Sequence, residues 1–345
     1  MSAETPPKTT SNVKTRVFLT VKVAVAAVLI GWLIRSGALD FGALGVFFRK
    51  PWLLAFDLCV FALSVATATL RWRALLAIPG VRAPLARLAQ LQLTAIFFNV
   101  VIPGNVGGDV VKALYVARDA APEKRTTILL IVFVERLLGL AGLVAVASMV
   151  TLVRGQTLFA DPLLRPIAGA VLLLGAGVIV GPAVFVLVMH RAGHHLERWI
   201  GGTTKIGKIL AQLVAAMRLL ASSPKNLAYA MLLSMAQHAF AIGLFTVLTR
   251  VVTDQDVAYS AVATVFPLGL LTLILPISPG GLGVGHVAFD RLFAAIGLRG
   301  GATVFNVYLL GQMVPSLLGA IPYLALRRKG ELPANEPVEQ PAALP

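Results

Sequence analysis

Long apolar runs dominate this chain and limit the folds that are open to it. Six runs approach the roughly 20 residues that a helix needs to cross a bilayer: Val17–Ile34, Trp52–Leu70, Thr126–Val153, Pro166–His190, Asn226–Leu248 and Thr303–Leu326. A soluble domain is excluded, because 58% of the residues are hydrophobic and 13% are charged. In soluble proteins about 45–50% of the residues are apolar and about 25% are charged. Membrane β-barrels would show alternation over roughly 10-residue strands, so we expect transmembrane helices.

Two further apolar stretches, Leu85–Ile102 and Ala258–Ile277, lead directly into segments rich in glycine and proline. These segments read PGNVGGDVVK (103–112) and SPGGLGVGHVAFDR (278–291). Within a bilayer, irregular backbone is tolerated only where it is buried in protein or lines a wet cavity. A matched pair of broken segments, one in each half, is typical of a transporter binding site.

The expected fold is therefore all-α, a polytopic transmembrane helical bundle of about six to eight membrane segments. The two broken segments are expected to be re-entrant, with full spans as the alternative. The similarity between P-G-x-x-G-G in one half and P-G-G-x-G-x-G in the other leaves an inverted repeat as an open alternative. The expected halves, roughly 17–190 and 226–328, form one transmembrane domain, 17–328, between disordered tails at 1–16 and 329–345.

The net charge of +15 fits membrane topology better than nucleic-acid binding. Most lysines and arginines between the apolar runs fall on one side of the membrane, including Arg71 and the basic loop 191–225. By the positive-inside rule this side is cytoplasmic, and both termini lie there. We expect Val17–Ile34 to be an uncleaved first helix. The amphipathic stretch Ile206–Leu220 is expected to lie along the cytoplasmic surface.

The first broken segment has the residues of an anion site. Gly104, Gly107 and Gly108 allow close approach of a ligand, and Asp109 stands where a helix would restart and could cap it. The N–H groups at that restart, together with Lys112, could hold a phosphate, with Asn105 adding a neutral donor and acceptor. The alternative is a tight turn with a helix cap and a cytoplasmic lysine.

Glu135 and Arg136 lie deep inside an apolar run, where an ionisable side chain indicates a functional site by default. Adjacent residues on a helix do not face each other, so each needs its own partner. Lys112 could pair with Glu135, and Asp109 could pair with Arg136. The alternative is that these pairs only lock the bundle. Gln237, His238, Asn306 and Gln312 also lie inside apolar runs, where hydrogen bonds between helices are the simplest role.

The second broken segment forms another glycine-rich cradle, at Ser278, Gly280, Gly281, Gly283 and Gly285. His286 and Asp290 stand four residues apart and would share a helix face. An imidazole near a carboxylate titrates close to physiological pH and could couple transport to protons. The alternative is a histidine that only hydrogen-bonds a neighbouring carbonyl. No motif for hydrolysis, nucleotide binding or metal binding is present in the sequence, so we expect no enzyme, no cofactor and no metal site.

Three segments in order resemble the transmembrane region of lysylphosphatidylglycerol synthases: IFFNVVIPGNVGGDVVKALYVAR, FVERLLGL and LPISPGGLGVGHVAF. The same module occurs in stand-alone flippase-like bacterial proteins, some of them linked to hopanoid pathways. The resemblance implies a multi-pass protein of the bacterial inner membrane that moves, or helps to move, an anionic or aminoacylated lipid between leaflets. Substrate-binding positions implied by the motifs are Asn105, Gly107, Gly108, Asp109, Lys112, Glu135, Arg136 and the cradle Ser278, Gly280, Gly281 and Gly283.

His286 also belongs to this expected site, although many relatives have a glutamate there. Few residues follow Arg328, so we expect no aminoacyl-transferase activity. The expected partners are membrane lipids with anionic, isoprenoid or hopanoid headgroups, with no nucleic acid among them. A second hypothesis is a non-transporting accessory protein that holds a lipid-processing enzyme at loop 191–225. A third, a membrane enzyme using His286 and Asp290, is disfavoured because no catalytic constellation accompanies them.

Overall fold

The structure, a computed structural model, describes residues 41–101, 107–160, 162, 164–200, 205–273 and 283–328. The first apolar run, both tails and the site residues Asn105, Ser278, Gly280 and Gly281 lie outside these ranges. The chain divides into two compact units. Phe41–Tyr323 is one unit, and the other comprises Met1–Asp40 with Leu324–Pro345, of which only the end of helix α15 is described.

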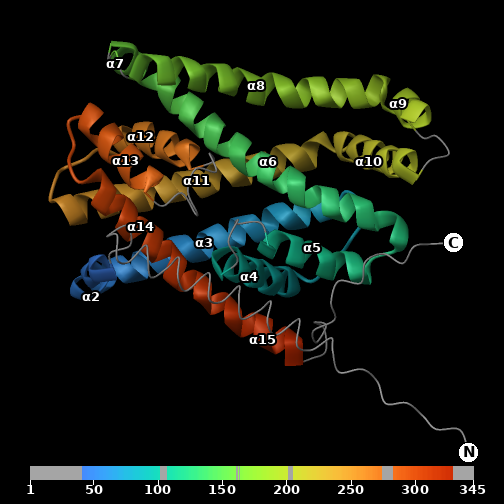
Figure 1. The fold of residues 1–345 in the computed structure, drawn as a ribbon, viewed down its shortest axis with the longest axis horizontal. Helices are drawn as coiled ribbons and strands as arrows, with labels where there is room; N and C mark the ends of the chain where they lie inside the picture. Colours follow the sequence, from blue (N-terminus) through green and yellow to red (C-terminus); the bar gives the residue numbers. More distant parts are fainter. Residues whose placement is uncertain are drawn as a thin grey trace, which may run out of the picture. The chain divides into compact units, whose positions relative to one another are not determined.

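The described residues form helices and no strands, which confirms the expected fold class (Figure 1). The elements are η1 (Phe41–Leu44), α2 (Gly45–Arg49), α3 (Pro51–Leu76), α4 (Leu85–Val101), α5 (Gly107–Asp119), α6 (Pro122–Val153), α7 (Gly155–Ala160), α8 (Leu164–Arg191), α9 (Gly193–Ile200), α10 (Lys205–Ala221), α11 (Pro224–Thr253), α12 (Tyr259–Thr272), α13 (Val284–Ala295), α14 (Gly301–Ser316), η3 (Leu317–Gly319) and α15 (Ala320–Arg328).

Five helical segments of the described chain are long and apolar enough to cross a membrane: Pro51–Leu76, Pro122–Val153, Arg165–Arg191, Pro224–Thr253 and Gly301–Leu326. They match five of the six expected runs. Proline opens α3, α6 and α11, where its missing N–H costs nothing because the first turn has no internal acceptor for it. These helices therefore begin one, four and two residues earlier than hydropathy alone predicts.

At each broken segment, the described residues form two short helices that are consecutive in the chain and pack against each other (Figure 1). Helices α4 and α5 form the first hairpin, and α12 and α13 form the second. A Cβ added at Gly108 of α5 would overlap the Ala95 carbonyl of α4, so glycine is what allows these two backbones to approach so closely. In the second hairpin, Gly269 of α12 leaves room for the Phe289 ring of α13.

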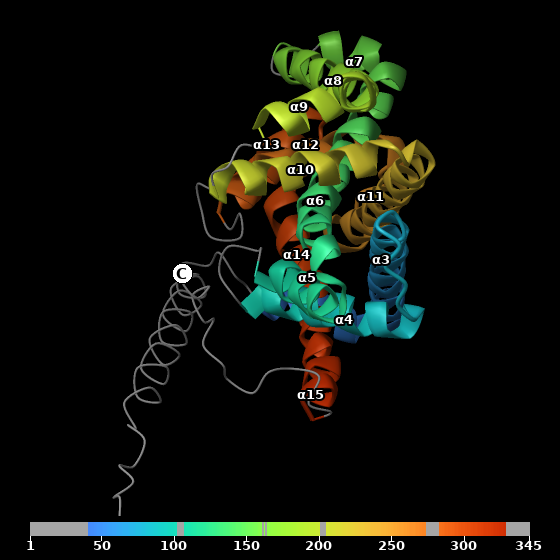
Figure 2. The ribbon, with the colours of Figure 1, turned by 90° about the vertical axis from the view of Figure 1, so that its right-hand side faces the viewer.

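The element order repeats: a long helix, two short helices and another long helical segment, first as α3–α6 and then as α11, α12, α13 and the segment Gly301–Leu326, which begins with α14. Helices α3 and α11 run antiparallel, because Arg71 contacts Ser234 whereas the later Ala74 contacts the earlier Asn226. Each hairpin follows the end of one of these two helices, so the hairpins enter the bundle from opposite ends. This is the arrangement expected of an inverted repeat. Helix α8 packs on α6 at the edge of the bundle, away from α4 and α5 (Figure 2).

Candidate functional site

Glu135 is the centre of a buried ionic network between the first hairpin and its flanking helices. It lies 13 residues into α6, roughly 20 Å along the helix. Its Oε2 accepts a hydrogen bond from Lys112 Nζ at 2.7 Å, and its Oε1 accepts one from Arg71 Nη2 at 3.2 Å. The Glu135 and Lys112 side chains are only 6% and 1% exposed. Two cations therefore flank one carboxylate deep inside an apolar helix.

Lys112 is held by acceptors on three helices. Besides Glu135, its ammonium donates to Gln92 Oε1 of α4 at 2.9 Å and lies 3.3 Å from Asp109 Oδ1. The three N–H donors of an ammonium thus match three nearby acceptors. The Lys112 Nζ also lies 4.9 Å from the centroid of the buried Trp72 ring, which adds a cation–π contact. The charge is well compensated.

Arg136 forms the accessible edge of the network. Its Nη2 donates to Asp109 Oδ2 at 2.6 Å, and the Arg136 side chain is 41% exposed against 14% for Asp109. Both pairings expected from the sequence, Lys112 with Glu135 and Asp109 with Arg136, are confirmed as contacts. Whether these residues bind a substrate stays a prediction.

Arg71 corrects a sequence-based expectation, which placed it in a cytoplasmic loop. Helix α3 continues past the end of the hydropathic run to Leu76, because no helix-breaking residue occurs before Pro79 and Gly80. The buried guanidinium donates to Ser234 Oγ at 3.0 Å and Gln237 Oε1 at 3.4 Å on α11, in addition to Glu135. Arg71 therefore ties both halves of the bundle to the network.

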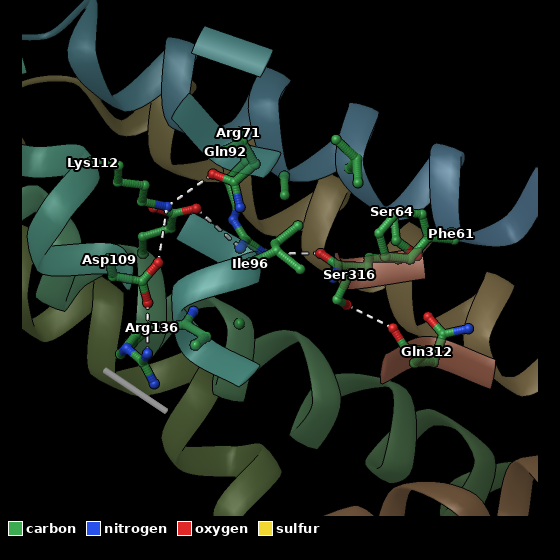
Figure 3. A pocket seen from close by; sticks show the side chains of 16 residues that line it. Phe61, Ser64, Arg71, Gln92, Ile96, Asp109, Lys112, Arg136, Gln312 and Ser316 are labelled. Atoms are coloured by element: carbon green, nitrogen blue, oxygen red, sulfur yellow. Dashed lines mark hydrogen bonds and ion pairs between the residues drawn. The ribbon is translucent and has the colours of Figure 1, made fainter. Parts of the chain in front are cut away.

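A cavity of about 350 Å³ opens beside this network (Figure 3). Its lining combines the ionic residues with neutral polar and apolar ones: Phe61, Ser64, Val65, Ala68, Arg71, Gln92, Ile96, Asn99, Asp109, Lys112, Glu135, Arg136, Gly139, Gln237, Gln312 and Ser316. Three cations and two carboxylates give the lining a formal charge of +1. We call it the charged cavity. Its chemistry suits a singly charged anion with an uncharged remainder.

A smaller cavity of about 140 Å³ shares Ser64, Gln237 and Gln312 with the charged cavity. We call it the neutral cavity, because its other polar lining residues are His238 and Tyr308. His238 Nε2 bonds the Gly139 carbonyl at 3.0 Å, and Gln312 Nε2 donates to Asp57 Oδ1 at 3.2 Å. The expected helix-to-helix hydrogen bonds of Gln237, His238 and Gln312 are thus confirmed. Asp57 itself was missed from the sequence.

In the second hairpin, His286 interacts with its own helix end. Gly283 adopts a φ of 84°, which favours glycine, and its N–H donates to His286 Nδ1 at 3.4 Å. The His286 ring packs edge-on against Phe305, with centroids 5.1 Å apart. Asp290 is exposed. The described part of this segment therefore resembles a capped helix start beside an aromatic core, and His286 and Asp290 are not lining residues of either cavity.

In the first hairpin, Gly107 and Gly108 begin α5. The expected cap, Asp109, lies in the first turn with its carboxylate engaged by Arg136 and Lys112. Asn99 of α4 takes the capping role, since its Oδ1 accepts the Gly108 N–H at 2.9 Å. This correction has a physical reason: the hairpin brings a neutral acceptor to the helix start, while the two cations draw the acid into the network.

These features define a helical membrane protein with a charged cavity inside its bundle. The family model of the lysylphosphatidylglycerol synthase transmembrane region matches residues 19–319. The chain belongs to this family, so it is a membrane protein of a family concerned with lipid metabolism. Searches of curated proteins and of solved structures found no match.

Proposed function

We propose that this protein moves a lipid with an anionic, phosphate-bearing headgroup between the leaflets of the bacterial inner membrane. The observation that carries the proposal is the charged cavity, whose lining has a formal charge of +1 within a bundle of apolar helices. A phosphodiester carries a single negative charge, so its entry would neutralise this lining. Membership of the family of lysylphosphatidylglycerol synthase transmembrane regions supports a lipid as the substrate.

Arg136 is the group best placed to contact the headgroup. Its side chain is 41% exposed, whereas the Lys112 side chain is 1% exposed and lies among three acceptors. A phosphate oxygen can replace Asp109 as the acceptor of an Arg136 N–H, and guanidinium–phosphate pairing is strong and directional. In this mechanism Glu135 and Arg71 hold the cavity in shape, while Asp109 and Arg136 exchange partners.

The arrangement of the helices supports movement across the membrane. Two hairpins that enter from opposite ends could open the cavity to one side and then to the other by rocking one half against the other. The acyl chains would stay in the bilayer while only the headgroup enters the polar space. In the proposed orientation both termini and the α9–α10 segment face the cytoplasm, in accordance with the distribution of basic residues.

Leaflet exchange in liposomes that contain only the purified protein tests the proposal. The lipids would be labelled phosphatidylglycerol, an isoprenoid phosphate and a hopanoid. We expect Arg136→Gln to slow exchange of the phosphate lipids by about tenfold or more, the value of one charge-assisted hydrogen bond. Arg291→Gln is the matched control, because Arg291 is an exposed arginine of the second hairpin.

The preferred lipid would identify the substrate class. Equal exchange by the native protein and Arg136→Gln would contradict the proposed site. No exchange of any lipid by folded protein would contradict transport and favour the alternative, an accessory protein that holds a lipid-processing enzyme at the membrane.

A further inference from the structure

Asp57 is a buried acid that the proposed exchange of partners does not use. It is 1% exposed and lies in the candidate span Pro51–Leu76, six residues after Pro51, which is about 9 Å along the helix. Its Oδ1 accepts the Gln312 Nε2–H at 3.2 Å. A Cβ added at Gly311 would lie 3.0 Å from the same oxygen, so the carboxyl packs directly against the backbone of α14.

No basic side chain among the described residues pairs with Asp57, whereas Asp109 and Glu135 each have two cationic partners. Phe47 of α2 lies beside Gly311, and the Arg49 of α2 is exposed. Tyr308 of α14 and His238 of α11 are the titratable groups that line the neutral cavity with Gln312. Arg87 of α4 pairs with Asp119, and Glu135 and Arg136 of α6 belong to the ionic network. A buried carboxyl in such surroundings is a proton site rather than an ion-pair partner.

Gln312 connects this carboxyl to the site, because its side chain lines both cavities. An amide offers two N–H donors on one side and a carbonyl acceptor on the other. An ionised Asp57 requires the N–H side, which leaves the Gln312 carbonyl for the cavities. A protonated Asp57 can donate its O–H to that carbonyl, and the amide then turns its N–H groups toward the cavities. Protonation thereby replaces an acceptor in the cavity wall with donors.

Charge acts in the same direction. The lining of the charged cavity has a formal charge of +1. An ionised Asp57 beyond Gln312 would lower the positive potential in this cavity, and a protonated Asp57 would not. Donors and positive charge both favour an anion. Headgroup binding and proton binding should therefore strengthen each other, and by linkage the coupling is reciprocal.

We propose that Asp57 binds a proton, and that its protonation state sets the affinity of the charged cavity for the lipid phosphate by orienting the Gln312 amide. The proposal rests on the proposed function, because it assigns the regulation of that same cavity. Asp57 acts through Gln312 and is a positioning residue that does not touch the headgroup. One proton is taken up from water when the phosphate enters, and it is released when the phosphate leaves.

Infrared difference spectroscopy tests proton uptake without requiring transport. Short-chain dihexanoyl phosphatidylglycerol would be added to the purified protein in detergent. We expect a protonated carboxyl C=O band to grow on lipid addition, to be absent in Asp57→Asn and to persist in His238→Gln. A native protein whose carboxyl region does not respond to bound lipid, or a band that survives in Asp57→Asn, would overturn the proposal.

The pH profile of leaflet exchange is the second readout. We expect native exchange to rise by up to tenfold per pH unit as the pH falls, because one proton is bound per headgroup. Asp57→Asn and Gln312→Met should flatten this profile, and His238→Gln should retain it. A native rate that is independent of pH, or one that follows sodium concentration instead, would overturn the proton site while leaving the proposed transport intact. Absence of exchange at every pH would contradict transport, and the infrared result would still decide the role of Asp57.

Discussion

The two hairpins have the same construction and opposite chemistry. Helices α4 and α5 surround charged groups, with Lys112 and Glu135 2.7 Å apart. Helices α12 and α13 instead pack phenylalanine rings against α11 and α14; Phe289 stacks on Phe305 at 4.8 Å, and Phe245 meets Phe266 at 4.8 Å. The difference indicates that the repeated helix order provides a common frame, in which the first half supplies the charged groups of the charged cavity and the second half packs an aromatic core.

Glu135→Ala should cause the largest loss of stability, because it leaves Lys112 and Arg71 buried without their shared acceptor. Removing one partner of a buried ion pair costs about 3–5 kcal/mol, and here two cations are affected. The midpoint of thermal unfolding in detergent, followed by tryptophan fluorescence, measures the loss. Glu123→Ala, at an exposed glutamate on the same helix, should leave the midpoint nearly unchanged. Equal midpoints for the two variants would show that the charged half is not held by its network.

Phe289→Ala should destabilise the aromatic core of the second half, with a somewhat smaller loss of stability than Glu135→Ala. The ring is fully buried and contacts Phe245, Phe266 and Phe305, and such truncations cost about 3–5 kcal/mol. The comparison predicts that the folded fraction keeps the native affinity for lipid phosphate, since this ring does not line the charged cavity. Val287→Ala, at an exposed position of α13, is the control. An affinity that falls with the folded protein intact would mean that the aromatic core is part of the site.

Gly108→Ala tests the close approach of α4 and α5. The new Cβ would overlap the Ala95 carbonyl, and relieving an overpacked contact costs about 1–3 kcal/mol. The hairpin should open enough to weaken lipid binding as well as to lower the unfolding midpoint. Gly177→Ala on α8 adds the same methyl group where no atom lies within 4 Å. If both variants behaved alike, backbone packing would not be what shapes the charged cavity.

Arg136→Gln should have the smallest effect on stability. A pair with a 41% exposed arginine contributes less than about 1 kcal/mol, so the unfolding midpoint should hardly move. Exchange of phosphate lipids should nevertheless fall. A large drop in the midpoint without a change in transport by the remaining folded protein would make this pair a structural lock.

Local patterns in the sequence predicted much of this arrangement. Hydropathy identified the five described spans, and the requirement that Glu135 and Arg136 find separate partners led to Lys112 and Asp109. The missed residues depend on distant contacts. Arg71 directly follows an apolar run, so composition placed it in a loop, whereas its partners lie on α6 and α11. Asp57 stands alone within an apolar run, and its partner Gln312 is 255 residues away; only the folded chain brings them together.

Calorimetric titration of the purified protein with dihexanoyl phosphatidylglycerol is the most direct test of the charged cavity as a headgroup site. The native protein and Arg291→Gln should bind with equal affinity, and Arg136→Gln should bind about tenfold or more weakly, the value of one lost charge-assisted hydrogen bond. Native affinity in folded Arg136→Gln would contradict the assignment of the headgroup to this cavity.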